Sequence, residues 1–387
     1  MESEPMRSRA CDVCSLALHH PRLLRWYLAL LMRRRAHARD YRGRDDGVAR
    51  MPCAMSLRPT FACNLNCRMC SFANSSSLSG DVPITGERDF LPVDVAKRLV
   101  DEIGSHPLIL SVTGGEPFLW PGLHEFLAHT RSQNIVTSVT TNGSLLPSRV
   151  DELMAAPPDV LIVSVLGDRE THDAIVGRAG MYDRIVEGLR AVHAAKRRKR
   201  FLRPLLVINT PILPENALVC YRVLELGRSI PVLAHHFQHL WFVTEDMRTR
   251  LERVGTEVKM SYTECIAVDT PSIDPEVIWQ GIERIRAHAK GTSTMFYPEL
   301  THDEVRTYYS DPCRLLKHDH AICGWIFTHV LPNGDVSPCL GLVAGNITQQ
   351  PFAEIWNGEE FRRFRRLLRE RRVLPICSRC CVFFRDI

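Results

Sequence analysis

Long apolar segments are absent from this sequence. The longest candidate, LLRWYLALLM at residues 23–32, is ten residues long, whereas a helix needs about 20 consecutive apolar residues to cross a bilayer. The first residues, MESEPMRSRACDVC, contain acids and lack the apolar core of a cleavable signal peptide. We therefore expect a cytoplasmic protein. Arginines follow the apolar run, so its helix either lies on the inner face of a membrane as a peripheral contact or packs on the main domain.

Signals for nucleic-acid binding are also scarce. The formal net charge is only +5 over 387 residues, and no nucleic-acid-binding motif accompanies the basic clusters at 33–35, 196–200 and 361–372. Clusters of this kind are usually solvated helix faces or helix ends. We therefore expect no nucleic-acid partner. With 45% apolar and 24% charged residues, the composition is that of a globular protein with room for a sizeable core.

Strand-like and helix-like segments alternate from residue 54 onward. Apolar strands separated by amphipathic helices predict an α/β fold with a parallel sheet. Six units are too few for a closed eight-fold barrel. We therefore predict an open, partial (β/α)6 TIM-like barrel, whose functional groups gather at the C-terminal ends of the strands. The predicted strands are 54–60, 108–114, 135–141, 159–167, 205–212 and 232–241, and the predicted helices are 92–104, 121–132, 146–155, 171–198 and 215–228.

The chain changes character near Cys313. Before it, the sequence predicts a helix at 274–290 and a strand at 293–297. After it, GWIFTHVLPNGDVSPCL (324–340) predicts a hairpin around its Pro-Asn-Gly-Asp turn, and a basic helix is predicted at 352–372. The three predicted parts are an N-terminal accessory helical segment (1–50), the barrel (51–312) and a small C-terminal cysteine-rich domain (313–387).

Cysteine, by contrast, is abundant. Fourteen cysteines are too many for packing alone, and in a reducing compartment clustered cysteines indicate metal rather than disulfides. Cys63, Cys67 and Cys70 follow the first predicted strand with the spacing C-x3-C-x2-C, and no fourth cysteine lies close by. Three thiolates can hold three irons of a four-iron, four-sulfur cluster and leave the fourth iron open. The alternative, a structural zinc, needs a fourth ligand nearby.

This spacing resembles that of the radical S-adenosylmethionine (SAM) superfamily, and the resemblance covers about residues 55–240. TGGEP (113–117) matches the motif with which the family holds the methionine amino group of SAM. One departure is Leu166, which replaces an aspartate that is usual near the fourth strand. The residues to which the resemblance gives a role in SAM binding are Gly114, Gly115, Glu116, Pro117, Asn142, Ser164 and Asn209.

The resemblance also implies the chemistry of the site. In this family, SAM chelates the open iron, and an electron from the reduced 4Fe-4S cluster cleaves it. The resulting 5′-deoxyadenosyl radical abstracts hydrogen from a substrate carbon, while the protein supplies binding and orientation. A flavodoxin or a ferredoxin is the expected electron donor.

A second set of cysteines lies in the C-terminal part. The pattern C-x10-G-x4-C from Cys323 to Cys339, followed by C-x2-C, resembles the SPASM or shortened twitch extension of the same superfamily over residues 313–381. The resemblance implies one auxiliary 4Fe-4S cluster, with Cys313 and Cys381 left open as alternative ligands. The other interpretation is a structural zinc with the same four ligands. The four ligands that the resemblance implies are Cys323, Cys339, Cys377 and Cys380.

Three histidines end the sixth predicted strand, in AHHFQHLW (234–241), where the mouth of the barrel is expected. If the segment stays extended, alternation puts His235 and His239 on the side opposite to His236. All three are candidate catalytic residues, because a histidine at this position can contact substrate.

The reaction that follows SAM cleavage is less constrained. About 50 residues precede the barrel, too few for a cobalamin-binding domain or for the recognition module of many peptide maturases. We therefore expect a small-molecule or lipid-like substrate, with dehydrogenation or carbon–carbon bond formation as the outcome. A peptide (RiPP) maturase with the same radical chemistry is the alternative. A non-enzymatic iron–sulfur or zinc protein is the alternative of another class, but such a carrier has no need for TGGEP.

Overall fold

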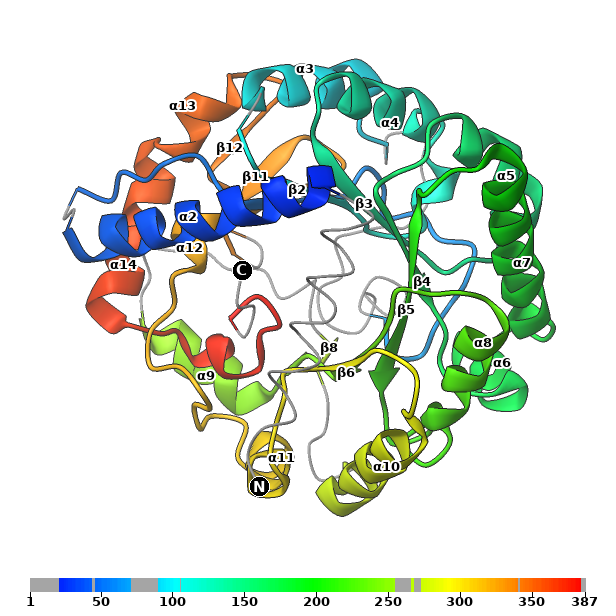
Figure 1. Cartoon of the computed structure of the whole chain (residues 1–387). Coiled ribbons are helices and arrows are strands. Elements are labelled where there is room, and N and C mark those ends of the chain that lie inside the picture. Colours follow the sequence, from blue (N-terminus) through cyan, green and yellow to red (C-terminus); the bar gives the residue numbers. More distant parts are fainter. Residues whose placement is uncertain are drawn as a thin grey trace.

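A curved sheet of ten strands forms the centre of the molecule, with the order β12-β11-β10-β1-β2-β3-β4-β5-β6-β9. Helices surround it, as Figure 1 shows around the rim of the view. This arrangement confirms the predicted α/β partial barrel. The computed structural model describes residues 21–43, 46–70, 90–104, 106–254, 266–267, 273–339 and 342–383.

All six predicted barrel strands form, and each pairs in parallel with the next. The predicted helix at 171–198 is two helices, because Gly177 and Gly180 adopt left-handed backbone conformations, with φ of +71° and +80°, between them. The strands are β1 (Ala54–Leu57), β2 (Ile109–Val112), β3 (Val136–Thr141), β4 (Val160–Ser164), β5 (Leu205–Ile212) and β6 (Ala234–His239). The helices between them are α3 (Val93–Ile103), α4 (Leu123–Ser132), α5 (Leu146–Ala155), α6 (Arg169–Val176), α7 (Met181–Lys199) and α8 (Val223–Ser229).

Two further strands extend the parallel sheet, one at each edge of the six. β9 (Thr294–Tyr297) pairs with β6, and β10 (Phe327–Val330) pairs with β1. β11 (Asp335–Ser337) then runs antiparallel to β10, as the hairpin pattern predicted, and β12 (Gly345–Asn346) follows it. The cysteine-rich part therefore shares one sheet with the barrel, which the sequence did not indicate.

The two faces of this sheet differ in exposure. On β2, Leu110 and Val112 are buried, whereas Ile109 and Ser111 are half-buried. The same alternation recurs along β4. Successive side chains of a strand point to opposite faces, and helices cover the outer one. The half-buried row therefore belongs to the inner face, which remains accessible to a ligand.

Helix α2 (Pro21–Gly43) packs on the body of the molecule rather than standing apart from it. The Tyr41 ring meets the Trp325 ring edge-on, with 5.0 Å between the centroids. The Arg33 guanidinium donates hydrogen bonds to the carbonyl oxygens of Met51 and Pro107, at 2.6 and 3.2 Å. In the described part of the chain, no helix is long and apolar enough to cross a membrane.

The segment after α2 is bound by the C-terminal helices α13 (Phe352–Trp356) and α14 (Glu359–Arg371). The Asn357 side chain accepts a hydrogen bond from the Ala49 amide (2.9 Å) and donates one to its carbonyl oxygen (3.0 Å). The Trp356 indole donates to the Arg50 carbonyl oxygen at 2.7 Å. These contacts join the N-terminal segment to the cysteine-rich part, whose short helix α12 (Cys323–Ile326) also contacts α2.

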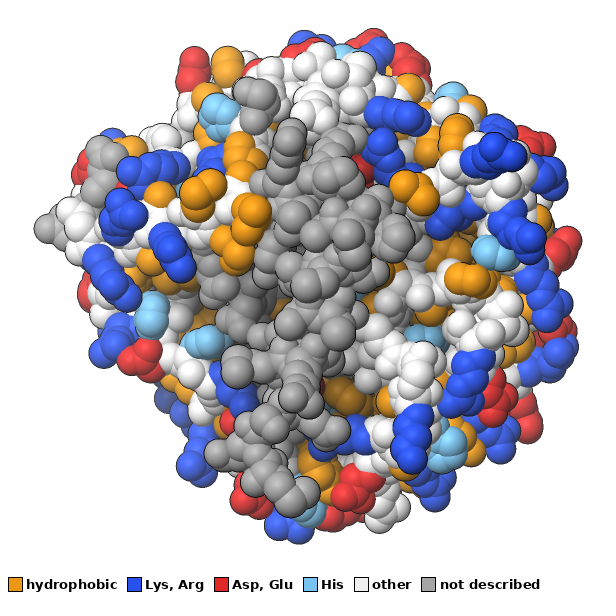
Figure 2. Space-filling view, in the orientation of Figure 1, with side chains coloured by type: hydrophobic (Ala, Val, Ile, Leu, Met, Phe, Trp, Pro, Cys, Tyr) orange, Lys and Arg blue, Asp and Glu red, His pale blue; other side chains and the backbone are white. Residues whose placement is uncertain are grey.

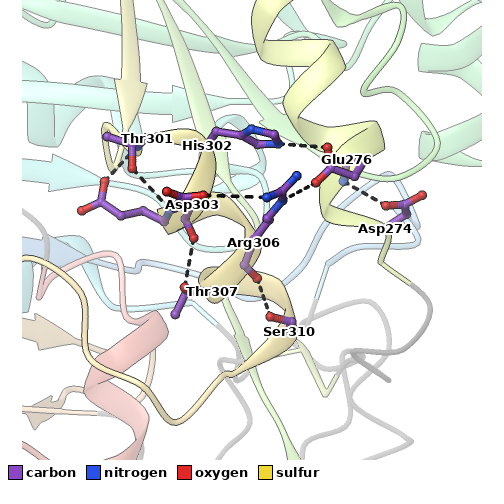
Figure 3. Close-up of polar contacts among 9 residues, drawn as sticks. Asp274, Glu276, Thr301, His302, Asp303, Arg306, Thr307 and Ser310 are labelled. Atoms are coloured by element: carbon purple, nitrogen blue, oxygen red, sulfur yellow. Dashed lines mark hydrogen bonds and ion pairs between the residues drawn. The ribbon is translucent and has the colours of Figure 1, made fainter.

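Helices α10 (Pro275–His288) and α11 (His302–Ser310) are tied together by side chains on their exposed sides (Figure 3). The Glu276 carboxylate pairs with His302 at 2.9 Å and with Arg306 at 2.5 Å. Each exposed pair contributes little to stability, about 0–1 kcal/mol, so the position of α11 depends mainly on its buried residues Val305, Tyr308 and Tyr309. The remaining elements are α9 (Glu245–Val254), the two-stranded sheet of β7 (Phe242–Val243) and β8 (Ile266–Ala267), and the short 3-10 helices Pro117–Leu119, Cys220–Arg222 and Pro375–Arg379.

We expect Asn357→Ala to destabilise the protein, because it leaves the amide and the carbonyl of Ala49 without their partner. The loss should be about 1–3 kcal/mol in the free energy of unfolding. Thermal unfolding followed by circular dichroism measures it. Glu370→Ala, an exposed change on α14, is the control and should leave the unfolding temperature unchanged; equal unfolding temperatures for both variants would contradict the role of Asn357.

Candidate functional site

The loop after β2 holds the cysteine-bearing loop after β1. The amides of Gly115 and Glu116 donate hydrogen bonds to the carbonyl oxygens of Thr60 (2.9 Å) and Ala62 (2.8 Å). A Cβ atom on Gly115 would lie 2.1 Å from the Ala62 oxygen, so no other residue allows this approach. Gly114 has a φ of +121°, where glycine is favoured. The close approach that the two glycines permit is thus between two loops of the chain.

The three thiols of the first cysteine loop lie close to one another. The pKa of Cys67 is raised to about 12, mainly by burial and to a smaller extent by the charges of Cys70 and Cys63. Burial also raises the pKa of Cys63. Neighbouring buried thiolates repel each other, so they are stable in that form only around positive charge such as iron. This arrangement fits a cluster held by three cysteines.

Glu116 is fully buried, and three donors fix its carboxylate. They are the hydroxyl of Thr141 at 2.7 Å and the amides of Asn142 at 2.8 Å and Phe118 at 3.1 Å. Burial raises the pKa of Glu116 to about 7, although the three hydrogen bonds act in the opposite direction. A buried carboxylate fixed in this way can accept a hydrogen bond from an amino group, as the resemblance expects for the methionine end of SAM.

Asn142, which follows β3, connects Glu116 to the cysteine loop. Its side-chain nitrogen lies 3.7 Å from the Cys63 sulfur and donates to the Asn64 side-chain oxygen at 2.9 Å. Ser144 closes a ring of hydrogen bonds, because its hydroxyl donates to Asn142 at 2.6 Å and accepts from Asn64 at 2.9 Å. An N–H group directed at a cluster sulfur orients the ligand and tunes its electron density. Ser144 was missed from the sequence, where no spacing marks it.

Ser164, Asn209 and His236 stand in one row across β4, β5 and β6. The register pairs Ser164 with Asn209 and Asn209 with His236, and all three are half-buried. Paired residues of a parallel sheet point to the same side. The row therefore lies on the inner face, and it continues on β9 with Met295, which is 46% exposed. Two residues expected to bind SAM thus lie beside one candidate catalytic histidine.

The other two histidine candidates point away from the inner face. His235 packs on α8, where a Cβ atom on Gly227 would lie 2.1 Å from its ring nitrogen. His239 is buried and shares a hydrogen bond of 2.9 Å with the Tyr309 hydroxyl. Burial lowers the pKa of His235 to about 4 and that of His239 to about 3. This placement removes both from the candidates, because neither can contact a substrate inside the barrel.

Three of the C-terminal cysteines converge. Burial raises the pKa of Cys323 to about 11 and raises those of Cys377 and Cys380, to which the charges of the neighbouring thiols add. Cys339 follows β11, and its carbonyl oxygen accepts a hydrogen bond of 2.6 Å from Ser337. Three converging thiols are suitable ligands for a second iron–sulfur cluster. Within the described residues, no three His, Cys, Asp or Glu side chains already surround the position of a single metal ion.

The two alternative ligands have different surroundings. The Cys313 thiol donates a hydrogen bond of 3.0 Å to the Asp246 carboxylate, and burial together with this bond raises its pKa to about 11. Cys381 lies near enough to Cys380 to raise its pKa. The Cys381 carbonyl oxygen accepts a hydrogen bond of 3.0 Å from the Tyr297 hydroxyl on β9. Cys381 therefore stays close to the converging thiols, whereas Cys313 has a carboxylate partner of its own.

Arg379, between Cys377 and Cys380, is a buried residue that the sequence did not single out. Its guanidinium is fully buried and donates to carbonyl oxygens at the end of α11, including those of Tyr308 at 2.7 Å and Asp311 at 2.6 Å. A buried cation needs such partners. Arg379 therefore positions the C-S-R-C segment against α11.

Two family models match the chain. The radical SAM superfamily model matches residues 57–217, and the SPASM iron–sulfur cluster-binding domain model matches residues 322–381. The chain is a radical SAM superfamily enzyme with a C-terminal SPASM iron–sulfur cluster-binding domain. Its cofactors are SAM and the 4Fe-4S cluster of the superfamily, with auxiliary iron–sulfur bound by the SPASM domain. The resemblance inferred from the sequence is confirmed.

Two relatives and one solved structure match most of this chain. The AdoMet-dependent heme synthase of Methanosarcina barkeri is 28% identical over 320 residues, covering 79% of this chain and 82% of that one. The AdoMet-dependent heme synthase of Nitratidesulfovibrio vulgaris is 24% identical over 319 residues, covering 79% of each chain. The structure of Streptococcus suis SuiB bound to precursor peptide SuiA matches with a TM-score of 0.61 at 14% identity, covering 92% of this chain and 74% of that one. This last likeness shows the fold alone.

We expect SAM binding to weaken as the pH falls through about 7, because the pKa of Glu116 lies there and the protonated acid no longer accepts the amino N–H. The loss should approach about tenfold in affinity for each pH unit below that value. Equilibrium dialysis of SAM with the reconstituted enzyme between pH 6 and pH 8.5 measures it. Glu116→Gln should bind SAM weakly at every pH; a Gln variant that keeps the wild-type pH profile would show that another group is responsible.

Proposed function

We propose that this enzyme cleaves SAM at a cluster held by Cys63, Cys67 and Cys70 and abstracts hydrogen from a small-molecule or lipid-like substrate on the inner face of the barrel. The observation that carries the proposal is the ring of contacts joining the cysteine loop, Glu116 and Asn142 at the ends of three successive strands. When bound, the cluster and SAM supply a 5′-deoxyadenosyl radical. Every other task falls to the protein.

The residues for SAM follow the order of the strands. Gly115 and Glu116 come after β2, Asn142 after β3, Ser164 at the end of β4 and Asn209 on β5. C-terminal ends of parallel strands meet at one edge of a sheet, so these side chains can contact one extended ligand. We assign the amino end of SAM to Glu116 and its nucleoside to the row of Ser164 and Asn209.

His236 is the candidate that we retain for a role with the substrate. It lies on the inner face beside Asn209. In a dehydrogenation, the substrate loses one hydrogen atom to the radical, one proton and one electron. We assign the proton to His236. Cys323, Cys339, Cys377 and Cys380 would hold an auxiliary cluster, which would supply an acceptor for the electron. Carbon–carbon bond formation by radical addition is the other outcome compatible with the same site.

The class of substrate is supported by the relatives. Two AdoMet-dependent heme synthases match over 79% of this chain, and heme is an iron porphyrin. A porphyrin-type small molecule is therefore the first substrate to test. The peptide alternative has weaker support, because the complex of SuiB with its precursor peptide shares only the fold.

Replacing Cys63, Cys67 and Cys70 together by alanine should abolish SAM cleavage, because the three thiols are the proposed ligands of the catalytic cluster. About four irons per chain should remain in the SPASM domain. Chromatography of 5′-deoxyadenosine after anaerobic reduction, together with iron analysis, measures both effects. Cys220→Ala, which alters a buried thiol bonded to the Ala217 carbonyl oxygen, is the control. Cleavage retained in the triple variant would refute the assignment.

Deuterium transfer separates the two substrate classes. We expect deuterium from a labelled porphyrin to enter 5′-deoxyadenosine, and none from a labelled precursor peptide. His236→Gln should still cleave SAM, yet release less oxidised product, because the proton acceptor is gone. Mass spectrometry of 5′-deoxyadenosine and product gives both quantities; His236→Gln with wild-type product yield would remove His236 from the mechanism.

A further inference from the structure

Helix α2 carries a solvent-facing strip that the fold does not use. The strip consists of Leu28, Leu31, Met32, Arg35 and Arg39, and the exposed fractions of its three apolar residues are 49%, 36% and 66%. Spacings of three and four residues put these side chains on one side of the helix. The strip is apolar toward the N-terminus and basic toward the C-terminus. Figure 2 shows hydrophobic side chains beside basic ones in the region of α2.

The opposite side of α2 fixes the direction in which the strip faces. Leu30, His37 and Asp40 are buried, with exposures of 5%, 0% and 4%. The Arg33 guanidinium binds two backbone carbonyl oxygens of the body, and Asp40 pairs with Arg50 at 2.8 Å. The helix is therefore held in place between Leu30 and Tyr41, and the exposed leucines and methionine cannot be buried by rotating it.

The charge of the strip is not balanced by the described part of the protein. No described carboxylate lies within ion-pair distance of Arg35 or Arg39. On the neighbouring helix α14, by contrast, Arg363 pairs with Glu360 and Arg366 with Glu359. On the solvated basic face of α14, glutamates of the same helix therefore pair with arginines. The α2 strip instead combines exposed apolar area with positive charge that no described carboxylate pairs with.

We propose that the α2 strip docks on an anionic phospholipid bilayer, with the helix lying in the plane of the surface. Leu28, Leu31 and Met32 enter the boundary between headgroups and acyl chains, while Arg35 and Arg39 meet lipid phosphates. A second copy of the chain is the less suitable partner: a symmetric contact brings arginines against arginines if the two helices run parallel, and charged guanidinium groups against apolar side chains if they run antiparallel.

Docking through the α2 strip determines which side of the molecule faces the membrane. In Figure 1, α2 lies across the near side of the barrel. A bilayer bound to its strip would therefore face that side of the molecule. This inference goes beyond the proposed function, because vesicle binding requires neither cluster nor SAM cleavage.

Flotation with vesicles tests the proposal. The holoenzyme is mixed with vesicles of phosphatidylcholine alone or of phosphatidylcholine with phosphatidylglycerol. We expect binding to the second kind, weakened by salt because charged lipids attract arginines through a screened interaction. Leu28→Glu with Met32→Glu should abolish it. Arg35→Gln and Arg39→Gln should each weaken it by about fivefold.

The control replaces two exposed apolar residues elsewhere, Leu202→Glu with Leu233→Glu, and should bind like the wild type. SAM cleavage in vesicle-free buffer should be unchanged in the strip variants, so a failure of docking is distinguishable from a failure of the proposed function. The proposal is overturned if neither vesicle binds, or if the strip and control variants lose binding equally. It is also overturned if light scattering reveals a dimer that Leu28→Glu with Met32→Glu abolishes.

Discussion

Two backbone hydrogen bonds, from Gly115 to Thr60 and from Glu116 to Ala62, are the contact on which the candidate site depends. They bring the loops after β1 and β2 so close that only glycine fits at position 115. Because of them, the Glu116 carboxylate affects the pKa of the Cys63 thiol. Asn142 then bonds to both loops. One short stretch of pairing thus places the proposed metal ligands and the proposed SAM ligands in a single rigid unit.

The pairing of β10 with β1 has a comparable effect on the second cysteine set. It makes the SPASM domain continuous with the barrel sheet, since β10 begins directly after α12, the short helix that starts at Cys323. The buried guanidinium of Arg379 adds a second attachment, to the end of α11. The converging thiols are therefore held from two sides by groups that belong to the body of the enzyme.

Strong local signals explain what the sequence predicted. The six barrel strands and the first cysteine loop follow from periodicity and spacing, and the family comparison confirms the superfamily. Features that depend on contacts between distant parts of the chain could not be predicted from the sequence. Whether β10 pairs with β1 depends on tertiary packing, and Gly177 and Gly180 divide a helix that periodicity alone makes continuous. No sequence signal marks Arg379, because burial of a guanidinium among backbone carbonyl oxygens leaves no pattern in residue spacing.

The hydrogen bond from Tyr297 to the Cys381 carbonyl oxygen has a mechanical consequence. Tyr297 belongs to β9, at one edge of the parallel strands, while β10 forms the other edge and leads into the same cysteine-rich segment. The cysteine-rich segment therefore contacts both edges of the parallel strands, one through β10 and the other through Tyr297. Any movement of β9 away from β10 would have to break the Tyr297 hydrogen bond.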